Sequence, residues 1–262
     1  MLQSPLSGSY SSSFPQNRWN SKGLFLCHIL MALLVASLFS PFTKGIWQTI
    51  DIWFFKTLNH TLDGNRPWQV FWALANHKLA DWVEDLFFLG FFVVYVRGAP
   101  KGLRIKRVVH LVFIVLFIAS ILYFINGKLF REVLRIPRES PTLVVESSVK
   151  LSNEIDWLKI KDDSSKSFPG DHGTTALLFA TSFVLLARGR MALLACFYGA
   201  FLCLPRLITG AHWLSDIVVG SGSIVLVCFS WAFCTPFACT CTWAIEKCFL
   251  SFKIWKEKWC SL

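Results

Sequence analysis

The sequence predicts an all-α integral membrane protein whose six transmembrane helices form a bundle. Three observations support this fold class: 54% of the 262 residues are hydrophobic, only 16% are charged, and uncharged apolar runs recur along the chain. A soluble globular domain has roughly 25% charged residues. In so apolar a chain, the formal net charge of +10 primarily indicates which loops face the cytoplasm and is not evidence of a nucleic-acid surface. We therefore expect membrane lipids and not nucleic acid as partners.

Six segments approach the roughly 20 apolar residues that a helix needs to cross a hydrocarbon core of about 30 Å. They are residues 24–40, 86–96, 108–125, 173–187, 191–205 and 217–238. The second reaches spanning length only by including residues 79–85, which brings Asp81, Glu84 and Asp85 to one membrane surface. Acids at this depth are either site residues or caps of a solvated helix end, and we favour the solvated end.

The segments outside these spans are expected to lie at the membrane surface. Residues 1–23 are polar and rich in serine, which predicts a disordered segment ahead of a membrane anchor. A cleaved signal peptide is disfavoured because the first apolar run is longer than the usual core of such a peptide. Residues 46–62 have helical apolar spacing, as in a helix lying flat in the interface. Residues 24–245 would form the catalytic domain, and residues 246–262 a basic tail.

The distribution of Lys and Arg predicts which loops face the cytoplasm. Residues 97–107 contain five basic residues and no acid, so this loop is expected to be cytoplasmic. Alternation of the spans then places both termini in the cytoplasm. The same alternation places residues 41–80, residues 126–168 and the turn at Gly210 together on the outer side.

Polar residues that would be costly in a bilayer form three clusters, and the topology brings all three to the outer side. The first cluster follows the third span, the second opens the fourth span, and the third bridges spans five and six. Their members are Lys128, Arg131, Arg135 and Arg138; residues 167–173, with Gly170, Asp171 and His172; and Pro205, Arg206, Gly210, His212 and Asp216. This convergence indicates a site.

In the third cluster, His212 and Asp216 are four residues apart and therefore share a helix face. The Asp216 carboxylate can then accept the Nδ1 proton of His212, which leaves Nε2 free as a nucleophile. Arg206 reaches the same place only if the helix breaks, and Gly210 can supply the break. A guanidinium fork beside a nucleophile suits a phosphoryl group.

The other two clusters supply further groups for phosphoryl transfer. The entry at Gly170 presents backbone N–H groups to an anion, and His172 is placed to act as a general acid. Lys128 with Arg135, or Arg131 with Arg138, are seven residues apart and would lie on one helix face. These cations would stabilise charge on the non-bridging oxygens.

A metal centre is the other chemical option for the two histidines and Asp216. Zinc surrounded by three or more arginines would be electrostatically unfavourable, so no metal or other cofactor is expected. The nine cysteines show no zinc-type spacing, and we interpret them as packing residues.

The pattern Arg206, five residues, His212, three residues, Asp216 resembles the third signature of the type 2 phosphatidic acid phosphatase superfamily. Residues 169–172 resemble the second signature, but they are Pro-Gly-Asp-His where most of the superfamily has Pro-Ser-Gly-His. The first signature is Lys, six residues, Arg-Pro, and neither candidate pair fits it fully. We prefer Arg131 and Arg138.

Residues 138–143, 167–173 and 210–213 together resemble one branch of that superfamily, the lipid A 1-diphosphate synthases. The resemblance implies a bacterial inner-membrane phosphotransferase with a periplasmic site, which moves phosphate from undecaprenyl diphosphate to the 1-phosphate of lipid A or a lipopolysaccharide precursor.

The resemblance also implies a role for each site residue. His212 would become a phosphohistidine, held by Asp216, while His172 protonates the leaving group. The transferring phosphoryl group would be neutralised by Arg206, Arg131, Arg138 and the backbone near Gly170. We further hypothesise that Asp171 tunes the site for a phosphate acceptor by pairing with an arginine.

Two other functions stay open on the sequence alone. The signatures also permit a hydrolase that releases inorganic phosphate from undecaprenyl diphosphate or another lipid phosphate. A non-enzymatic anion carrier or channel would use the buried cations as a path.

Overall fold

The structure, a computed structural model, describes residues 17–187 and 189–259, and its regular elements within these ranges are helices. The longer helices are α1 (Ser21–Phe39), α2 (Lys44–Asn59), α3 (Arg66–Ala75), α4 (Lys78–Arg97), α5 (Arg104–Ser120), α8 (Asp171–Leu186), α9 (Gly189–Ile208), α10 (Gly222–Cys234) and α11 (Phe237–Trp259). Two π-type segments extend this set, η3 (Ile121–Leu134) after α5 and η4 (Asp216–Ser221) before α10. The short elements are η1 (His60–Leu62), η2 (Lys101–Leu103), α6 (Pro141–Val144) and α7 (Leu151–Glu154).

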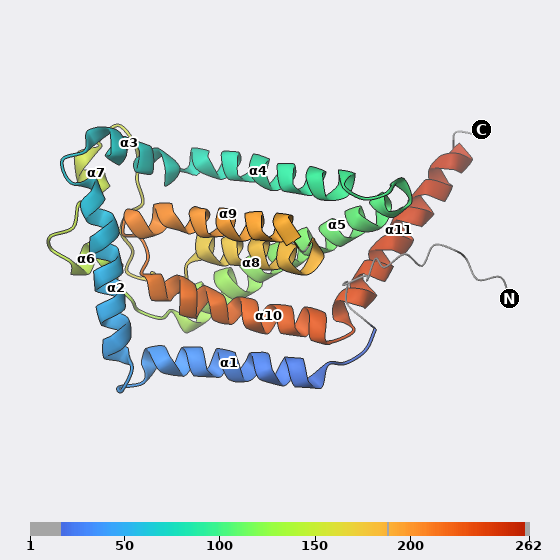
Figure 1. Cartoon of the computed structure of the whole chain (residues 1–262), viewed down its shortest axis with the longest axis horizontal. Coiled ribbons are helices and arrows are strands. Elements are labelled where there is room, and N and C mark those ends of the chain that lie inside the picture. Colours follow the sequence, from blue (N-terminus) through green and yellow to red (C-terminus); the bar gives the residue numbers. More distant parts are fainter. Residues whose placement is uncertain (1–16, 188, 260–262) are drawn as a thin grey trace.

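The axes of helices α1, α4, α8, α9 and α10 are nearly parallel, with α1 and α9 running opposite to the other three, and α5 crosses them obliquely (Figure 1). Within this bundle α8 packs against α9, and α1 packs against α10. Helix α2 runs across one end of the bundle, where α3, α6 and α7 also lie (Figure 1). The bundle therefore has one end built from the segments that were expected on the outer side.

Aromatic side chains fill the contact between α4, α8 and α9. The rings of Phe88 and Phe179 have centroids 4.4 Å apart, and Phe183 and Tyr198 join the same cluster. Gly199 lets α8 and α9 approach closely, because a Cβ atom there would lie 3.0 Å from the carbonyl oxygen of Ala176. The close pair α8–α9 brings the start of α8 and the end of α9 to the same end of the bundle.

Four helical segments of the described chain are long and apolar enough to cross a membrane. They are Ser21–Phe39, Lys101–Leu134, Gly189–Ile208 and Asp216–Cys234. Helix α8 has only 16 residues, and α4 carries Asp81, Glu84 and Asp85 near its start. Length and composition thus support four of the six expected spans, and the count of six stays a prediction.

Several boundaries differ from the expectation. The last span ends at Cys234 and not at Ala238, because Thr235 is extended before Pro236 and the residue before a proline avoids the helical region. The third span continues through η3 to Leu134, and this extension carries Arg131. Helix α3 was not predicted.

The predictions for the two ends of the chain and for the interfacial helix are tested only in part. Residues 1–16, most of the segment expected to be disordered, lie outside the described residues, and α1 begins at Ser21. Residues 46–62 are helical as α2 and η1, and their position in the membrane interface stays a prediction. The expected basic tail continues α11 as far as Trp259.

Two extended segments pair side by side at the end of the bundle near α2. Ser140 N donates to the Ser164 carbonyl over 2.9 Å, and Ser167 N donates to the Arg138 carbonyl over 2.8 Å. Side chains on an extended segment alternate between its two sides. The paired segments, 138–140 and 164–167, therefore form a thin wall with a different set of side chains on each side.

Candidate active site

A small cavity of about 110 Å³ lies on one side of this wall, at the start of α8 and the end of α9. It brings together members of all three polar clusters that the sequence singled out. Its charged and imidazole lining consists of Arg131, Lys161, Lys166, Asp171, His172, Arg206 and His212. We call it the phosphate cavity, because this lining is rich in donors for an anion.

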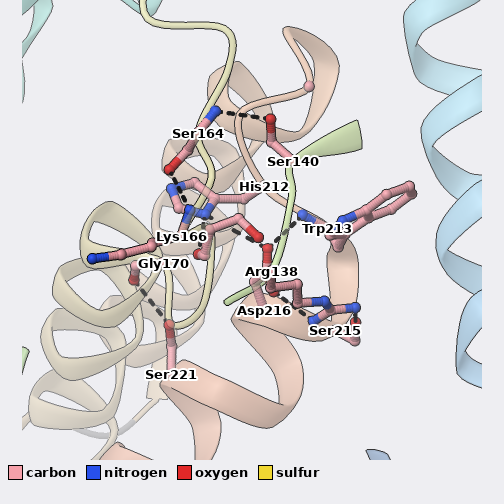
Figure 2. Close-up of polar contacts among 12 residues, drawn as sticks. Arg138, Ser140, Ser164, Lys166, Gly170, His212, Trp213, Ser215, Asp216 and Ser221 are labelled. Atoms are coloured by element: carbon pink, nitrogen blue, oxygen red, sulfur yellow. Dashed lines mark hydrogen bonds and ion pairs between the residues drawn. The ribbon is translucent and has the colours of Figure 1, made fainter. Parts of the chain in front are cut away.

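His212 is held in the tautomer that a nucleophile requires. Its Nδ1 lies 2.7 Å from the carbonyl oxygen of Ser167, and a carbonyl can only accept, so Nδ1 carries the proton (Figure 2). Nε2 then keeps its lone pair. The predicted tautomer is present, but the predicted acceptor was wrong: Asp216 Oδ2 lies 3.7 Å from Nδ1 and accepts from Trp213 N over 2.8 Å.

Arg138 is bound to carboxylates behind the phosphate cavity and does not line it. Its Nη1 donates to Asp216 Oδ1 over 2.5 Å, and its Nη2 donates to Asp51 Oδ2 over 2.8 Å and to Ser215 Oγ over 2.7 Å. Asp216 is fully buried. Instead of lining the cavity as expected for contact with phosphate, Arg138 forms an ion pair that fixes Asp216, the first residue of η4.

Asp51 belongs to this network, and the sequence analysis missed it. The residue is 2% exposed, and its carboxylate also accepts from Ser215 N over 2.9 Å. Burial raises the pKa of Asp51, while hydrogen bonds from Ser215 and the charge of Arg138 oppose that rise. The sequence did contain a signal: Asp51 is an acid one turn from Trp47 and one turn from Phe55, on a helix predicted to lie flat in the membrane interface.

Arg206 and His172 meet at the cavity, and Asp81 lies beside them. Arg206 Nη2 lies 2.7 Å from His172 Nε2, and Asp81 Oδ1 lies 3.4 Å from the same nitrogen. The other arm of Arg206 donates to the Asn76 carbonyl over 2.8 Å, in a side chain that is almost completely buried. Asp81 lies in the first turn of α4 with 45% of its side chain exposed, as expected of a solvated helix end, and it also contacts a residue of the cavity.

The break expected at Gly210 is present. Helix α9 ends at Ile208, and Gly210 adopts a φ of +80°, a conformation that glycine tolerates best. A Cβ atom there would lie 2.5 Å from Thr142 Cγ2 and 2.8 Å from Phe55 Cε2. The break lets Arg206 and His212 line the same cavity.

Arg131 lines the phosphate cavity and forms an ion pair with Asp171, which also accepts from Asn126 Nδ2 over 3.1 Å. The hypothesis that Asp171 pairs with an arginine thus agrees with the structure. The alternative pair points elsewhere: Lys128 binds Glu132 over 2.8 Å, and Arg135 Nε donates to the Glu132 carbonyl. Neither Lys128 nor Arg135 lines the cavity.

Gly170 supports His212 from behind and does not line the cavity. Its carbonyl accepts from Thr174 Oγ1 over 2.9 Å and from Ser221 Oγ over 3.0 Å (Figure 2). A Cβ atom at Gly170 would lie 3.5 Å from His212 Nδ1. The neighbouring residues Pro169 and Asp171 supply that part of the lining.

A second cavity, of about 900 Å³, lies on the opposite side of the wall, between α1, α2 and residues 136–139. Its lining includes Arg138, Asp51 and Trp213 among apolar side chains of α1 and α2. The Arg138 network thus separates a large, mostly apolar space from the phosphate cavity.

Comparison with known proteins agrees with this site. Residues 136–243 match the family model described as the PAP2 superfamily. Over 220 residues the chain is 30% identical to Lipid A 1-diphosphate synthase of Escherichia coli (strain K12), an alignment that covers 83% of this chain and 89% of that relative. No solved structure matches the chain.

Proposed function

Because the chain belongs to the PAP2 superfamily, we propose that it is a membrane phosphotransferase that moves the terminal phosphate of undecaprenyl diphosphate to the 1-phosphate of lipid A. The observation that carries the proposal is His212, whose Nδ1–H is fixed on the Ser167 carbonyl beside a cavity rich in cations. The similarity to a lipid A 1-diphosphate synthase supports the choice of acceptor.

In the first step, the lone pair on His212 Nε2 attacks the terminal phosphorus of the donor. The new P–N bond forms as the bond between the terminal phosphorus and the bridging oxygen breaks, and undecaprenyl phosphate leaves with the electron pair. Arg206 and Arg131 stabilise the charge on the non-bridging oxygens.

His172 is our proposed proton donor to the departing phosphate. Asp81 lies within reach of its Nε2 and would stabilise the protonated ring. The demand for this proton is modest, because a phosphomonoester has its second pKa at about 6 and leaves readily as an anion. In the structure Arg206 Nη2 donates to this nitrogen, so Nε2 would take up the proton that it delivers only once Arg206 has turned to the bound phosphoryl group.

In the second step, an oxygen of the lipid A 1-phosphate attacks the phosphorus of the phosphohistidine. The P–N bond breaks, its electrons return to Nε2, and a diphosphate forms. Water would give inorganic phosphate instead, so the acceptor decides between transfer and hydrolysis. The Arg131–Asp171 pair, at a position where most of the superfamily has glycine, would favour the phosphate acceptor.

We also propose that the protein lies in a bacterial inner membrane with the phosphate cavity facing the periplasm and both termini in the cytoplasm. The basic loop at residues 97–107 supports this orientation. It lies between α4 and α5, at the end of the bundle away from α2 (Figure 1).

The test uses protein purified in detergent and undecaprenyl diphosphate labelled in its terminal phosphate, with and without lipid A. Label on lipid A supports the proposal, whereas label only in free phosphate would make the protein a hydrolase. His212→Ala should abolish both products, and His60→Ala, an exposed histidine outside the cavity, is the matched control. Full function of His212→Ala would favour the carrier or channel.

A further inference from the structure

The phosphate cavity contains two lysines that belong to none of the motifs considered above. Lys161 and Lys166 line it together with Arg131 and Arg206, while Asp171 is the one carboxylate in its lining. Among the described residues, neither lysine has a carboxylate within ion-pair distance. The cavity therefore holds positive charge that the protein itself does not neutralise.

The charges in this cavity act on one another. Desolvation of the ammonium group and the nearby charges of Arg131 and Arg206 lower the pKa of Lys161. Cations held close together without counter-charges repel one another. An anion entering between them would relieve this repulsion, so the arrangement is complementary to more negative charge than Asp171, paired with Arg131, and Asp81, 4.0 Å from Arg206, provide.

The backbone holds both lysines in place. Lys166 lies on the paired segment 164–167, where Ser164 and Lys166 line the phosphate cavity and Ser165 lines the larger one. Its side chain points away from the Arg138 guanidinium (Figure 2). Lys161 precedes Asp162, whose buried carboxylate accepts from Ser152 N over 2.8 Å.

The two steps of the proposed reaction place the same kind of group opposite His212, and the positive charge of the cavity suits both steps. In the first step the group opposite His212 Nε2 across phosphorus is the departing prenyl phosphate, and in the second step it is the attacking phosphate. Both are phosphomonoesters bearing up to two negative charges. A hydrolase of the same donor would use such charge only for its leaving group, because neutral water attacks in its second step, whereas a phosphotransferase would use it in both steps.

We propose that Lys161 and Lys166 form a second phosphate subsite, which binds the leaving phosphomonoester in the first step and the acceptor phosphomonoester in the second. The inference rests on the proposed function and adds an activity to it. Because leaving group and acceptor share one subsite, the protein exchanges the terminal phosphate between a prenyl diphosphate and a prenyl monophosphate in the absence of lipid A. One P–O bond breaks and one forms, with no water consumed.

The exchange is tested with labelled undecaprenyl diphosphate and an unlabelled prenyl monophosphate of shorter chain, with lipid A omitted. Label in the diphosphate of the shorter prenol is expected. Normal transfer to lipid A without any exchange would overturn the shared subsite.

The lysines are tested with the double variant Lys161→Gln/Lys166→Gln. Loss of charge-assisted hydrogen bonds should raise the KM for either acceptor at least about tenfold, and the KM for the donor by a smaller factor. Lys159→Gln, an exposed lysine of the same loop that does not line the cavity, should stay within about twofold of the wild type. An unchanged acceptor KM in the double variant would overturn the assignment.

The outcome stays informative if the proposed function fails. Should the protein only hydrolyse its donor, undecaprenyl phosphate is still the leaving group, and its inhibition constant measures the subsite. An inhibition constant about tenfold higher in the double variant than in the wild type would support the subsite. Equal inhibition constants in the two proteins would contradict it.

Discussion

Arg138 Nη1 lies 2.5 Å from Asp216 Oδ1, behind the phosphate cavity and on the face of the wall that borders the larger cavity. The same guanidinium binds Asp51 on α2. One arginine thus ties a helix that crosses the end of the bundle to the loop that carries His212. We therefore expect residues of this network to act by positioning and not by contact with the phosphoryl group.

Removal of Asp51 tests this positioning role. Asp51→Ala leaves Arg138 short of one partner and Ser215 N without an acceptor, and breaking a buried ion pair costs on the order of 3 kcal/mol. We expect a lower melting temperature in detergent and a lower kcat with little change in donor KM. Asp63→Ala, an exposed acid after η1, is the control. A rise in donor KM with unchanged kcat would indicate that Asp51 contacts substrate.

Asp216→Asn separates two accounts of His212. Where an aspartate fixes the tautomer of a catalytic histidine, its replacement by asparagine costs about 10⁴ in kcat. Here the Ser167 carbonyl fixes Nδ1–H, so we expect a smaller loss and a retained tautomer. The measurements are kcat and the ¹⁵N chemical shifts of the His212 ring. A loss as large as that of His212→Ala, with the proton moved to Nε2, would contradict the structure.

Asp171→Gly tests the acceptor preference. The change removes the partner of Arg131, so the guanidinium is free to turn from the acceptor position. We expect the ratio of transfer to hydrolysis to fall several-fold, as is typical when a charge-assisted pair is lost. The ratio of labelled lipid A to labelled free phosphate measures it. An unchanged ratio would remove Asp171 from acceptor selection.

Gly210→Ala tests the break between Arg206 and His212. A side chain at a φ of +80° is strained, and the new Cβ atom would collide with Thr142 and Phe55. Strain of this kind costs of order 1–3 kcal/mol, so both the melting temperature and kcat should fall. Gly45→Ala, with open space around its Cβ position, should leave both near the wild-type values; equal behaviour of the two variants would contradict the proposed role of the break.

The sequence predicted the part of the site that depends on one turn. Its pairings by helical spacing were wrong, because His212 Nδ1 bonds to Ser167 and not to Asp216, and Arg138 lines a different cavity from Arg131. Gly210, with its positive φ, and the approach of Arg206 to His212 follow from residues within a single short stretch. The partners of Arg138 could not be predicted in this way. They come from α2 and from the start of η4, far apart in the chain, and side-chain spacing carries no information on such pairs.

The acceptor of the His212 proton escaped prediction for a different reason. A backbone carbonyl such as that of Ser167 has no signature in the sequence. The helical fold and the long apolar segments were predictable, because composition and apolar length alone determine them. The shorter α8 and the acidic start of α4 show where those two criteria stop being sufficient.

The pH dependence of transfer should report on Lys161. The folded protein lowers the pKa of this lysine from its ordinary value of 10.5, so Lys161 loses its charge at a lower pH than a free lysine would. A phosphate acceptor needs that charge, and transfer should therefore weaken as pH rises through the lowered pKa. Arginine keeps its charge throughout this range, so Lys161→Arg should extend transfer to higher pH, measured as acceptor KM against pH. The same alkaline limb in wild type and Lys161→Arg would assign the titration to another group.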